Sequence, residues 1–282
     1  MRWRGGRTGG GIEDRRGLGP AAAGGLGVGG VVLALIGYFV FGINPSDTLN
    51  AVGSSTPVQQ EQGVRGTPAD EAGRFVDVVA TNVDDVWRAV FSQSGQTYEP
   101  PAAIVLYDRA TGTGCGMGQS AMGPFYCPAD HKVYLDLSFW QELEGRFGAG
   151  GDAARAYVLA HEIGHHVQSL TGASDEARRM GARGPTSGSV RLELQADCYA
   201  GVWAAHAAQV SQGQVALDPN DIEDGLRAAS AVGDDALQRQ AQGRVMPDAF
   251  THGTSAQRTR WFRKGVEAGD PAACDTFSAA RL

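Results

Sequence analysis

Three of the six histidines lie in one short stretch, "YVLAHEIGHHVQSL", which spans residues 157–170. On a helix, side chains four residues apart share a face, so His161 and His165 can direct their imidazoles at one ion. Glu162 lies one position further on and can reach a water molecule held by that ion. Two histidine ligands with a neighbouring carboxylate predict a catalytic zinc site in which Glu162 is the general base.

A second stretch downstream, "RLELQADCYAGVWAAH", offers the third ligand. Catalytic zinc takes three protein ligands and leaves a fourth position for water. Glu193 and Asp197 are four residues apart and would share one face of a second helix whose other positions are mostly apolar. We expect Glu193 to complete a His₂Glu site and Asp197 to accept the free ring N–H of His161. A helix that carries two solvated acids is the alternative.

The remaining polar candidates are weaker. His252, in "DAFTHGTSAQR", precedes a capped helix and is our candidate for stabilising an oxyanion, although it can equally hold its own loop by hydrogen bonds. Tyr157 and Tyr199 are lesser candidates for that role, and packing in the core is favoured for Tyr157. The other histidines lie off the ligand face, in a turn or near a helix end, and receive no catalytic role: His131, His166 and His206.

Several blocks of this sequence resemble a known family. "HEIGHHVQ" followed by "ELQAD" resembles the gluzincin pattern of thermolysin-like peptidases, HExxH with a later glutamate in ExxAD. "GPFYCPADHKVYLDLSF", "HEIGHHVQSLTG", "ELQADCYAGVWA" and "FTHGTSAQRTRWF" together resemble the bacterial putative neutral zinc metallopeptidase family over most of residues 100–277. All metal-site positions of the pattern are present: His161, Glu162, His165, Glu193 and Asp197.

The resemblance implies a zincin-like metallopeptidase domain that binds one Zn²⁺ and hydrolyses peptide bonds in a peptide or protein substrate. In related peptidases an extended substrate pairs with an edge strand that precedes the active helix. The segment "VYLDL", residues 133–137, occupies that place here. An interior structural strand is an equally compatible interpretation of this segment.

The elements that must position these residues follow from periodicity and capping signals. Helical spacing predicts helices from residue 70, over 138–147, 152–170 and 190–208, from Asp218-Pro219, and from a Ser255 cap to about residue 267. Strand chemistry is present over 102–108 and 132–137, and residues 173–189 read as a loop. A few strands followed mostly by helices predict an α+β fold with a small sheet and a mainly helical remainder.

The composition sets outer limits on function. The chain has 282 residues with a net charge of −7, 42% hydrophobic residues and 20% charged residues, which is typical of a globular protein. A nucleic-acid partner is disfavoured because no basic surface is available to meet phosphates.

An uncharged apolar run occupies residues 21–43, long enough as a helix to cross a hydrocarbon core. Five arginines precede this run, and few charges follow it before residue 68. By the positive-inside rule we expect a cytoplasmic Arg-rich tail over 1–20, a single transmembrane helix over 21–43, a flexible linker over 44–70 and an extracytoplasmic metallopeptidase domain over 71–282.

Two further readings of the apolar run stay open. A cleaved signal peptide is the alternative to a membrane helix, although no convincing cleavage site follows the run. Gly25 and Gly29 form a GxxxG pattern, which offers a helix-mediated homodimer.

Four cysteines and no CxxC pair suit an exported protein. We favour a disulfide between Cys115 and Cys127, because "CGMGQSAMGPFYC" reads as a hairpin-like excursion whose ends can meet. A disulfide between Cys198 and Cys274 follows by elimination. Four buried free thiols are the alternative.

The sequence therefore predicts a membrane-anchored zinc metallopeptidase. The alternative is a non-hydrolytic envelope interaction module in which zinc only staples two helices together. Glu162 favours hydrolysis, because a purely structural zinc site needs no such carboxylate. Hydrolysis of a non-protein amide, such as a cell-wall crosslink, would use the same residues.

Overall fold

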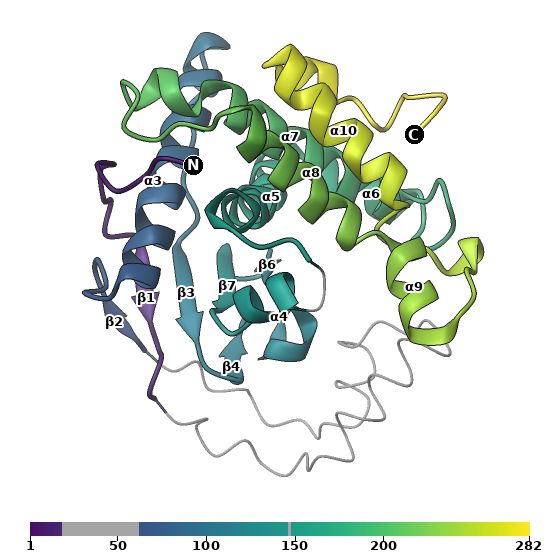
Figure 1. The fold of residues 1–282 in the computed structure, drawn as a ribbon. Coiled ribbons are helices and arrows are strands. Elements are labelled where there is room, and N and C mark those ends of the chain that lie inside the picture. Colours follow the sequence, from purple (N-terminus) through teal and green to yellow (C-terminus); the bar gives the residue numbers. More distant parts are fainter. Residues whose placement is uncertain (19–61, 146–147) are drawn as a thin grey trace.

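The computed structural model describes residues 1–18, 62–145 and 148–282. A mixed five-stranded sheet lies beneath a group of packed helices (Figure 1). The strands run in the order β2-β1-β3-β7-β6, and a separate hairpin pairs β4 with β5. The strands are β1 Ile12–Asp14, β2 Val64–Arg65, β3 Ala103–Tyr107, β4 Ala110–Thr113, β5 Gly116–Gln119, β6 Phe125–Cys127 and β7 Lys132–Asp136.

The sheet is parallel in its centre and antiparallel at both margins. β1, β3 and β7 run parallel, whereas β2 and β6 pair antiparallel with their neighbours. Every residue of β3 is buried, as expected for a strand with both faces covered. Ile104 and Leu106 face the main core, whereas Val105 and Tyr107 face a second, smaller cluster.

The helices form most of the main core. They are α3 Glu71–Gln93, α4 Phe139–Gly145, α5 Asp152–Thr171, α6 Ala173–Arg179, α7 Gly188–Val210, α8 Pro219–Ala231, α9 Asp234–Gln242 and α10 Ser255–Ala268. α7 packs against α5 and α10, and α8 packs against the same two helices (Figure 1). α7 is therefore central, and the site depends on how its two neighbours approach it.

Glycines permit these close approaches. A Cβ atom on Gly265 of α10 would lie 2.0 Å from the Cys198 carbonyl oxygen, and one on Gly201 of α7 would lie 2.2 Å from the Phe262 oxygen. A Cβ atom on Gly164 of α5 would lie 3.3 Å from the Ala196 oxygen. Side chains at these positions would push α5 and α10 away from α7.

The α+β prediction is confirmed: the sheet is small and the remainder is mainly helical. α5 and α7 begin and end within two residues of the predicted bounds. Asp218 caps α8 in a capping box, but the cap of α10 is Thr254 rather than Ser255. The predicted loop over 173–189 contains α6. The short elements β1, β2, β4, β5, β6 and α9 are not predicted from the sequence.

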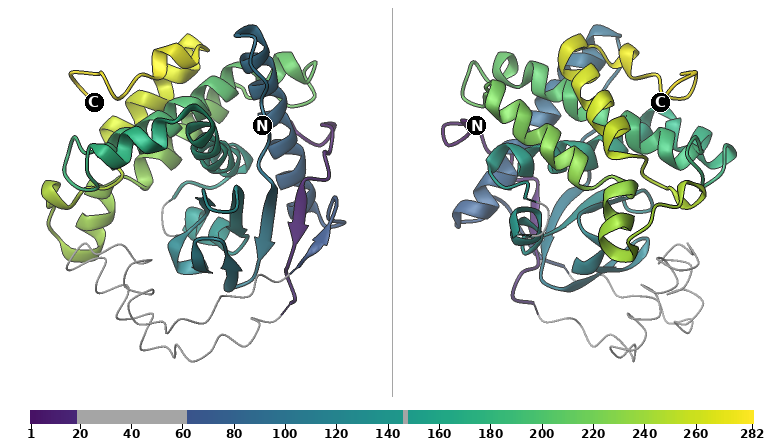
Figure 2. Two further views of the ribbon diagram at one scale, coloured as in Figure 1. Left: turned by 180° about the vertical axis from the view of Figure 1, so that it is seen from behind. Right: turned by 45° about the vertical axis from the view of Figure 1, so that its right-hand side comes forward.

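The first 18 residues belong to the folded unit rather than to a separate tail. β1 lies between β2 and β3, and the N-terminal segment, purple in Figures 1 and 2, follows the sheet. The Trp3 ring N–H donates to Asp152 in the first turn of α5. Arg15 is only 1% exposed and pairs with Glu13, so this arginine serves the core and does not mark a membrane flank.

The predicted transmembrane helix over 21–43 lies outside the described residues, as does most of the predicted linker. Within the described ranges, no helix combines the length and apolar character needed to cross a membrane. The end of the predicted linker contributes β2 to the sheet. Among the described residues, the structural unit thus comprises 1–18 with 62–145 and 148–282, and it begins before the predicted domain start at residue 71.

Both favoured disulfides are present, and no cysteine is free. Cys115–Cys127 joins the turn between β4 and β5 to β6. Cys198–Cys274 joins α7 to the short 3₁₀ helix Pro271–Cys274 near the C-terminus. Each disulfide therefore anchors an element that contributes to the site.

Candidate metal centre

α5 and α7 lie side by side and bring the predicted ligands together. The candidate ligand atoms of His161, His165 and Glu193 all lie within 4.8 Å of one another. The Nε2 atom of His161 is 3.2 Å from one carboxylate oxygen of Glu193, and that of His165 is 3.5 Å from the other. The Glu193 carboxylate therefore faces both imidazole rings, as a shared metal site requires.

In each imidazole the outer nitrogen, Nδ1, points away from Glu193 and has its own hydrogen-bond acceptor. His161 Nδ1 lies 2.8 Å from Asp197 Oδ1, and His165 Nδ1 lies 2.8 Å from Gln168 Oε1. When each Nδ1 carries a proton and donates outward, each Nε2 keeps its lone pair for a metal. The structure thus shows the predicted contact between Asp197 and His161.

Asp197 is fully buried, and its carboxylate contacts Arg258 and Tyr157 in addition to His161. Arg258 on α10 donates from Nε to one carboxylate oxygen and from Nη2 to the other, each at 2.8 Å. The Tyr157 hydroxyl donates to Oδ1 at 2.5 Å. Burial alone would raise the pKa of Asp197, but the charges of Arg258 and His161 hold that pKa below its usual range. Asp197 is therefore an ionised acceptor for His161.

The electrostatic environment differs between the two ligand histidines. Burial opposes the charged form of both rings. For His161 the adjacent Asp197 outweighs burial and raises the pKa to about 9. His165 has no carboxylate behind it, and burial lowers its pKa to about 4. The centre thus favours a positive charge between His161 and Glu193, either a proton on His161 Nε2 or a metal cation in the place of that proton.

Glu193 is the ionised carboxylate of the centre. Burial would raise its pKa, but the charges of His165 and His252 and a hydrogen bond from His161 hold the pKa well below its usual range. Its side chain is 17% exposed and that of His165 is 15% exposed. The ligands can therefore be reached from solvent, while Asp197 behind them is sealed.

Glu162 follows His161 on α5 and differs from the other two carboxylates. Burial raises its pKa to about 7, against the smaller opposing effects of His161 and of a backbone hydrogen bond from Tyr126 on β6. A carboxylate with a near-neutral pKa can both accept and release a proton at physiological pH. This property suits the predicted general base.

His252 lies on a tightly held loop before α10. The backbone N–H groups of Thr251, His252 and Gly253 all donate to Asp234 Oδ2, and His252 Nδ1 is 3.2 Å from Asp234 Oδ1. Burial would lower the pKa of His252, but Glu193 and Asp234 raise it to about 9. The loop-holding interpretation is therefore present in the structure, and the oxyanion role stays a prediction.

The tyrosine candidates have other contacts. Tyr157 contacts Asp197, whereas Tyr199 packs edge-on against Trp87 with ring centroids 5.0 Å apart. His166 is buried and hydrogen-bonds to the Tyr126 hydroxyl and the Glu99 carbonyl. The other two histidines contact a tyrosine hydroxyl and a backbone carbonyl: His131 contacts Tyr126, and His206 contacts Gly269.

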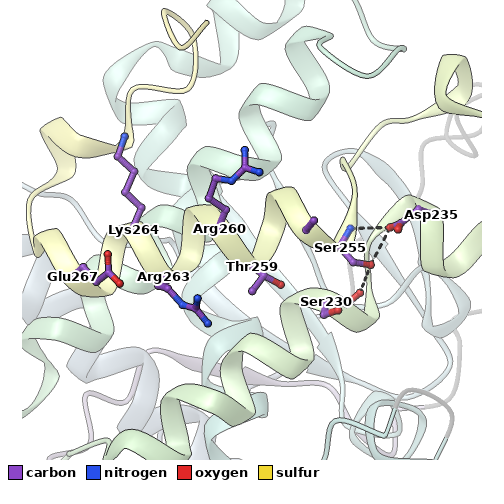
Figure 3. A pocket seen from close by; sticks show the side chains of 9 residues that line it. Ser230, Asp235, Ser255, Thr259, Arg260, Arg263, Lys264 and Glu267 are labelled. Carbon is purple, nitrogen blue, oxygen red and sulfur yellow. Dashed lines mark hydrogen bonds between the residues drawn. The ribbon is translucent and has the colours of Figure 1, made fainter. Parts of the chain in front are cut away.

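α10 carries basic side chains on two sides, one buried and one at the surface. Arg258 points into the core, whereas Arg260, Arg263 and Lys264 line an open surface hollow along the helix (Figure 3). At the start of α10, Ser255 binds Ser230 of α8 and Asp235 of α9. None of the metal-centre residues lines this hollow, which is a separate feature.

Sequence reasoning missed Arg258 and Gln168. Arg258 lies in "AQRTRWF", where a single arginine at an otherwise core-facing helical position was the available signal. Gln168 lies three residues after His165, on the adjacent turn, and nothing but that spacing marked it. Their partners on α7 could not be identified from local spacing.

An HExxH helix that faces an ExxAD helix, with two imidazoles and a carboxylate converging, is the arrangement expected of a gluzincin-type metal centre. The chain belongs to the family described as "Putative neutral zinc metallopeptidase", which matches residues 1–277. The match includes the N-terminal segment that forms β1.

Curated relatives cover much of the chain. It is 47% identical over 290 aligned residues to "Uncharacterized protein YpfJ" of Escherichia coli K12, covering 98% of this chain and 99% of that protein. It is 49% identical over 223 residues to "Uncharacterized protein Rv2575" of Mycobacterium tuberculosis, covering 75% of this chain and 74% of that protein. No solved structure matches the chain significantly.

Proposed function

We propose that this protein is a zinc-dependent metallopeptidase that hydrolyses peptide bonds with Glu162 as general base. The observation that carries the proposal is the convergence of both Nε2 atoms on the Glu193 carboxylate, with Glu162 beside His161 on the same helix. A site that only joined two helices would need no such neighbouring acid.

The residues present fit zinc. Two imidazoles and one carboxylate are the protein ligands of His₂Glu catalytic sites, and the outer nitrogens are already paired. His161, His165 and Glu193 would hold one ion per chain. When bound, zinc lowers the pKa of a coordinated water and polarises a carbonyl group.

The chain's own residues divide the remaining work. Glu162 accepts a proton from water on its carboxylate and later passes that proton to the leaving amine nitrogen. Asp197, held by Arg258 and Tyr157, keeps the His161 ring oriented. His252, whose charge acts on Glu193, is proposed as the donor to the developing oxyanion.

The substrate-binding strand must be reassigned. The candidate segment over 133–137 lies largely in β7, which is interior because β3 and β6 pair with its two sides. β6 is the margin of the sheet, and among the described residues no strand pairs with its outer side. β6 packs against α5, and Tyr126 donates its backbone N–H to Glu162. We propose that an extended peptide or protein segment pairs with β6.

The two disulfides support an extracytoplasmic location, because disulfides persist in oxidising compartments. Attachment to a membrane through residues 21–43, and a homodimer formed through that segment, stay predictions because these residues lie outside the described ranges.

The test compares the full-length parent with Glu162→Gln. A matched control, Glu176→Gln, alters an exposed glutamate of α6. All three proteins are expected to bind one zinc per chain by elemental analysis. The parent and the control should cleave a peptide library, whereas Glu162→Gln should lose about 10²- to 10⁴-fold in turnover.

Three results would contradict parts of the proposal. Equal cleavage by Glu162→Gln and the parent would remove Glu162 from the mechanism. Zinc binding by the parent without cleavage of any peptide would favour the interaction module. Cleavage of a cell-wall amide but of no peptide would change the substrate class.

A further inference from the structure

The outer nitrogen of His165 begins a chain of side-chain amides. Gln168 Oε1 accepts from His165 Nδ1 at 2.8 Å, and Gln168 Nε2 donates to the Leu192 carbonyl at 2.7 Å and to Gln195 Oε1 at 3.1 Å. Gln195 Nε2 then donates to the Cys274 carbonyl at 3.2 Å. Gln168 is fully buried and Gln195 nearly so. The chain links a ligand on α5 to the disulfide-anchored segment near the C-terminus.

The orientation of the Gln168 amide is determined by its partners. A side-chain amide has one acceptor oxygen and one nitrogen with two donor hydrogens. The oxygen faces a ring nitrogen, and the nitrogen faces two oxygen acceptors. If the amide were flipped, its oxygen would face the Leu192 carbonyl oxygen and Gln195 Oε1, and no hydrogen bond could form between these acceptors. The amide therefore presents an acceptor to His165, which requires the proton of that ring on Nδ1.

We propose that Gln168 is a positioning residue that holds His165 in the tautomer whose Nε2 atom is free to bind metal. Gln195 supports Gln168 from behind. The neutral amide of Gln168 orients the His165 ring without placing a negative charge beside it. Asp197, in contrast, both orients the His161 ring and places a negative charge beside it. This inference rests on the proposed metal site but does not require peptide hydrolysis.

The test measures zinc affinity of the full-length protein by competition with a chelator, together with the unfolding midpoint of the metal-free protein. Gln168→Met removes both acceptor and donors, and its zinc affinity should fall about 10- to 100-fold. Gln168→Glu keeps an acceptor for Nδ1 but loses the two donors. It should bind zinc within a few-fold of the parent although its metal-free form is destabilised. The control is Gln240→Met, at an exposed position of α9.

The pair of variants separates positioning from packing. If Gln168 only packs, zinc affinity will follow stability, and Gln168→Glu will lose as much affinity as Gln168→Met. That result, or parent-like zinc affinity in Gln168→Met, would overturn the inference. A parent that binds zinc without cleaving peptides would contradict the proposed function alone, whereas a parent that binds no zinc would overturn both.

A separate observation concerns the two sides of the apolar run. β1 precedes the run and β2 follows it, yet they pair with each other through Glu13 and Arg65. β1 also pairs with β3 over Ile12–Asp14, and Lys132 of β7 binds Glu13 at 2.9 Å. Residues on both sides of the run thus build one sheet.

We infer that residues 1–18 lie on the same side of any membrane to which this protein is attached as residues 62–145 and 148–282. Paired strands are about 4.8 Å apart, whereas a hydrocarbon core is about 30 Å thick. The two parts therefore cannot lie on opposite sides of a membrane. This inference replaces the expectation of a cytoplasmic tail joined to an extracytoplasmic domain by a single transmembrane crossing. Removal of a leader that includes residues 1–18 would also delete a strand from within the sheet.

Cysteine labelling of the full-length protein in intact cells tests this placement. The native cysteines are paired, so a membrane-impermeant maleimide should report only on an added thiol. Arg4→Cys and Met180→Cys place thiols at exposed positions in the two parts. Both variants should be labelled to the same extent before lysis, and both fully after lysis. Labelling of one but not the other before lysis would overturn the inference.

Discussion

At the scale of residues, three carboxylates in one centre differ because their neighbours differ. The Arg258 guanidinium acts on Asp197 and imidazoles act on Glu193, whereas burial outweighs the nearby charges at Glu162. Their pKa values separate accordingly, with two below the usual range and one above it. This separation agrees with the roles proposed for Asp197 in orienting His161, for Glu193 in binding metal and for Glu162 in proton transfer.

Arg258 is expected to be essential for stability and zinc binding, although it is not one of the proposed metal ligands. Arg258→Met would leave Asp197 buried without its main countercharge, which typically costs about 3–5 kcal/mol. We expect unfolding at lower denaturant concentration together with weaker zinc binding. Arg263→Met, at an exposed position on the same helix, is the control and should change neither quantity. An Arg258→Met protein as stable as the parent would contradict the account of Asp197.

Asp84 on α3 predicts a pH dependence away from the centre. Burial raises its pKa to about 7, and the Tyr98 hydroxyl donates to it at 2.8 Å. The folded state therefore binds a proton that the unfolded state has released, and stability falls as pH rises from about 4 to about 7.

Asp84→Asn keeps an acceptor for Tyr98 and removes that titration. We expect the parent, relative to this variant, to lose about 2 kcal/mol of unfolding free energy between pH 5 and pH 8. Chemical unfolding of both proteins at the two pH values measures the difference. An unchanged difference would show that Asp84 is ionised throughout.

At the scale of elements, the centre depends on two crossings of α7. α5 supplies the histidines where Gly164 meets Ala196, and α10 supplies Arg258 where Gly265 meets Cys198. These glycines allow backbones to approach more closely than any other residue would. The helices, rather than the ligands alone, thus set the geometry of the centre.

Gly265→Ala should be strongly destabilising. In a helix this change alone would favour folding by about 0.5–1 kcal/mol. The added Cβ atom, however, would lie 2.0 Å from a backbone oxygen, so α10 would have to move. We expect a net loss of several-fold in zinc affinity and a lower unfolding midpoint. Gly145→Ala on α4 meets no atom within 4 Å and is the control that should keep both properties.

At the scale of the whole molecule, a metal would join parts of the chain that are distant in sequence. α5 and α7 are connected through α6 and a polar loop, and the ion would add a direct link between them. A ligand that binds only the folded state stabilises it in proportion to the logarithm of its concentration. Zinc should therefore act on the stability of the entire unit.

Zinc titration during thermal unfolding tests this link. For the parent, zinc at 1,000 times its dissociation constant should stabilise by about 4 kcal/mol. His161→Ala should show no such increase, because it removes a ligand. If His161→Ala gained as much stability from zinc as the parent, the ion would bind elsewhere.

The sequence alone was sufficient for the local features of this protein. Spacing on single helices placed His161 beside His165 and Glu193 beside Asp197, because helix periodicity acts within a few residues. The pairing of Cys115 with Cys127 was also predictable, because their separation is short. Capping signals placed the start of α8 for the same reason.

Only the tertiary structure decided which distant segments meet. Arg258 reaches Asp197 across 61 residues, and β1 pairs with β3 although about 90 residues separate them. The arginines before the apolar run suggested a tail because composition does not report burial, yet Arg15 is enclosed by Glu13 and the β4–β5 hairpin. Parallel pairing and buried ion pairs depend on long-range packing, for which a single sequence contains no periodic signal.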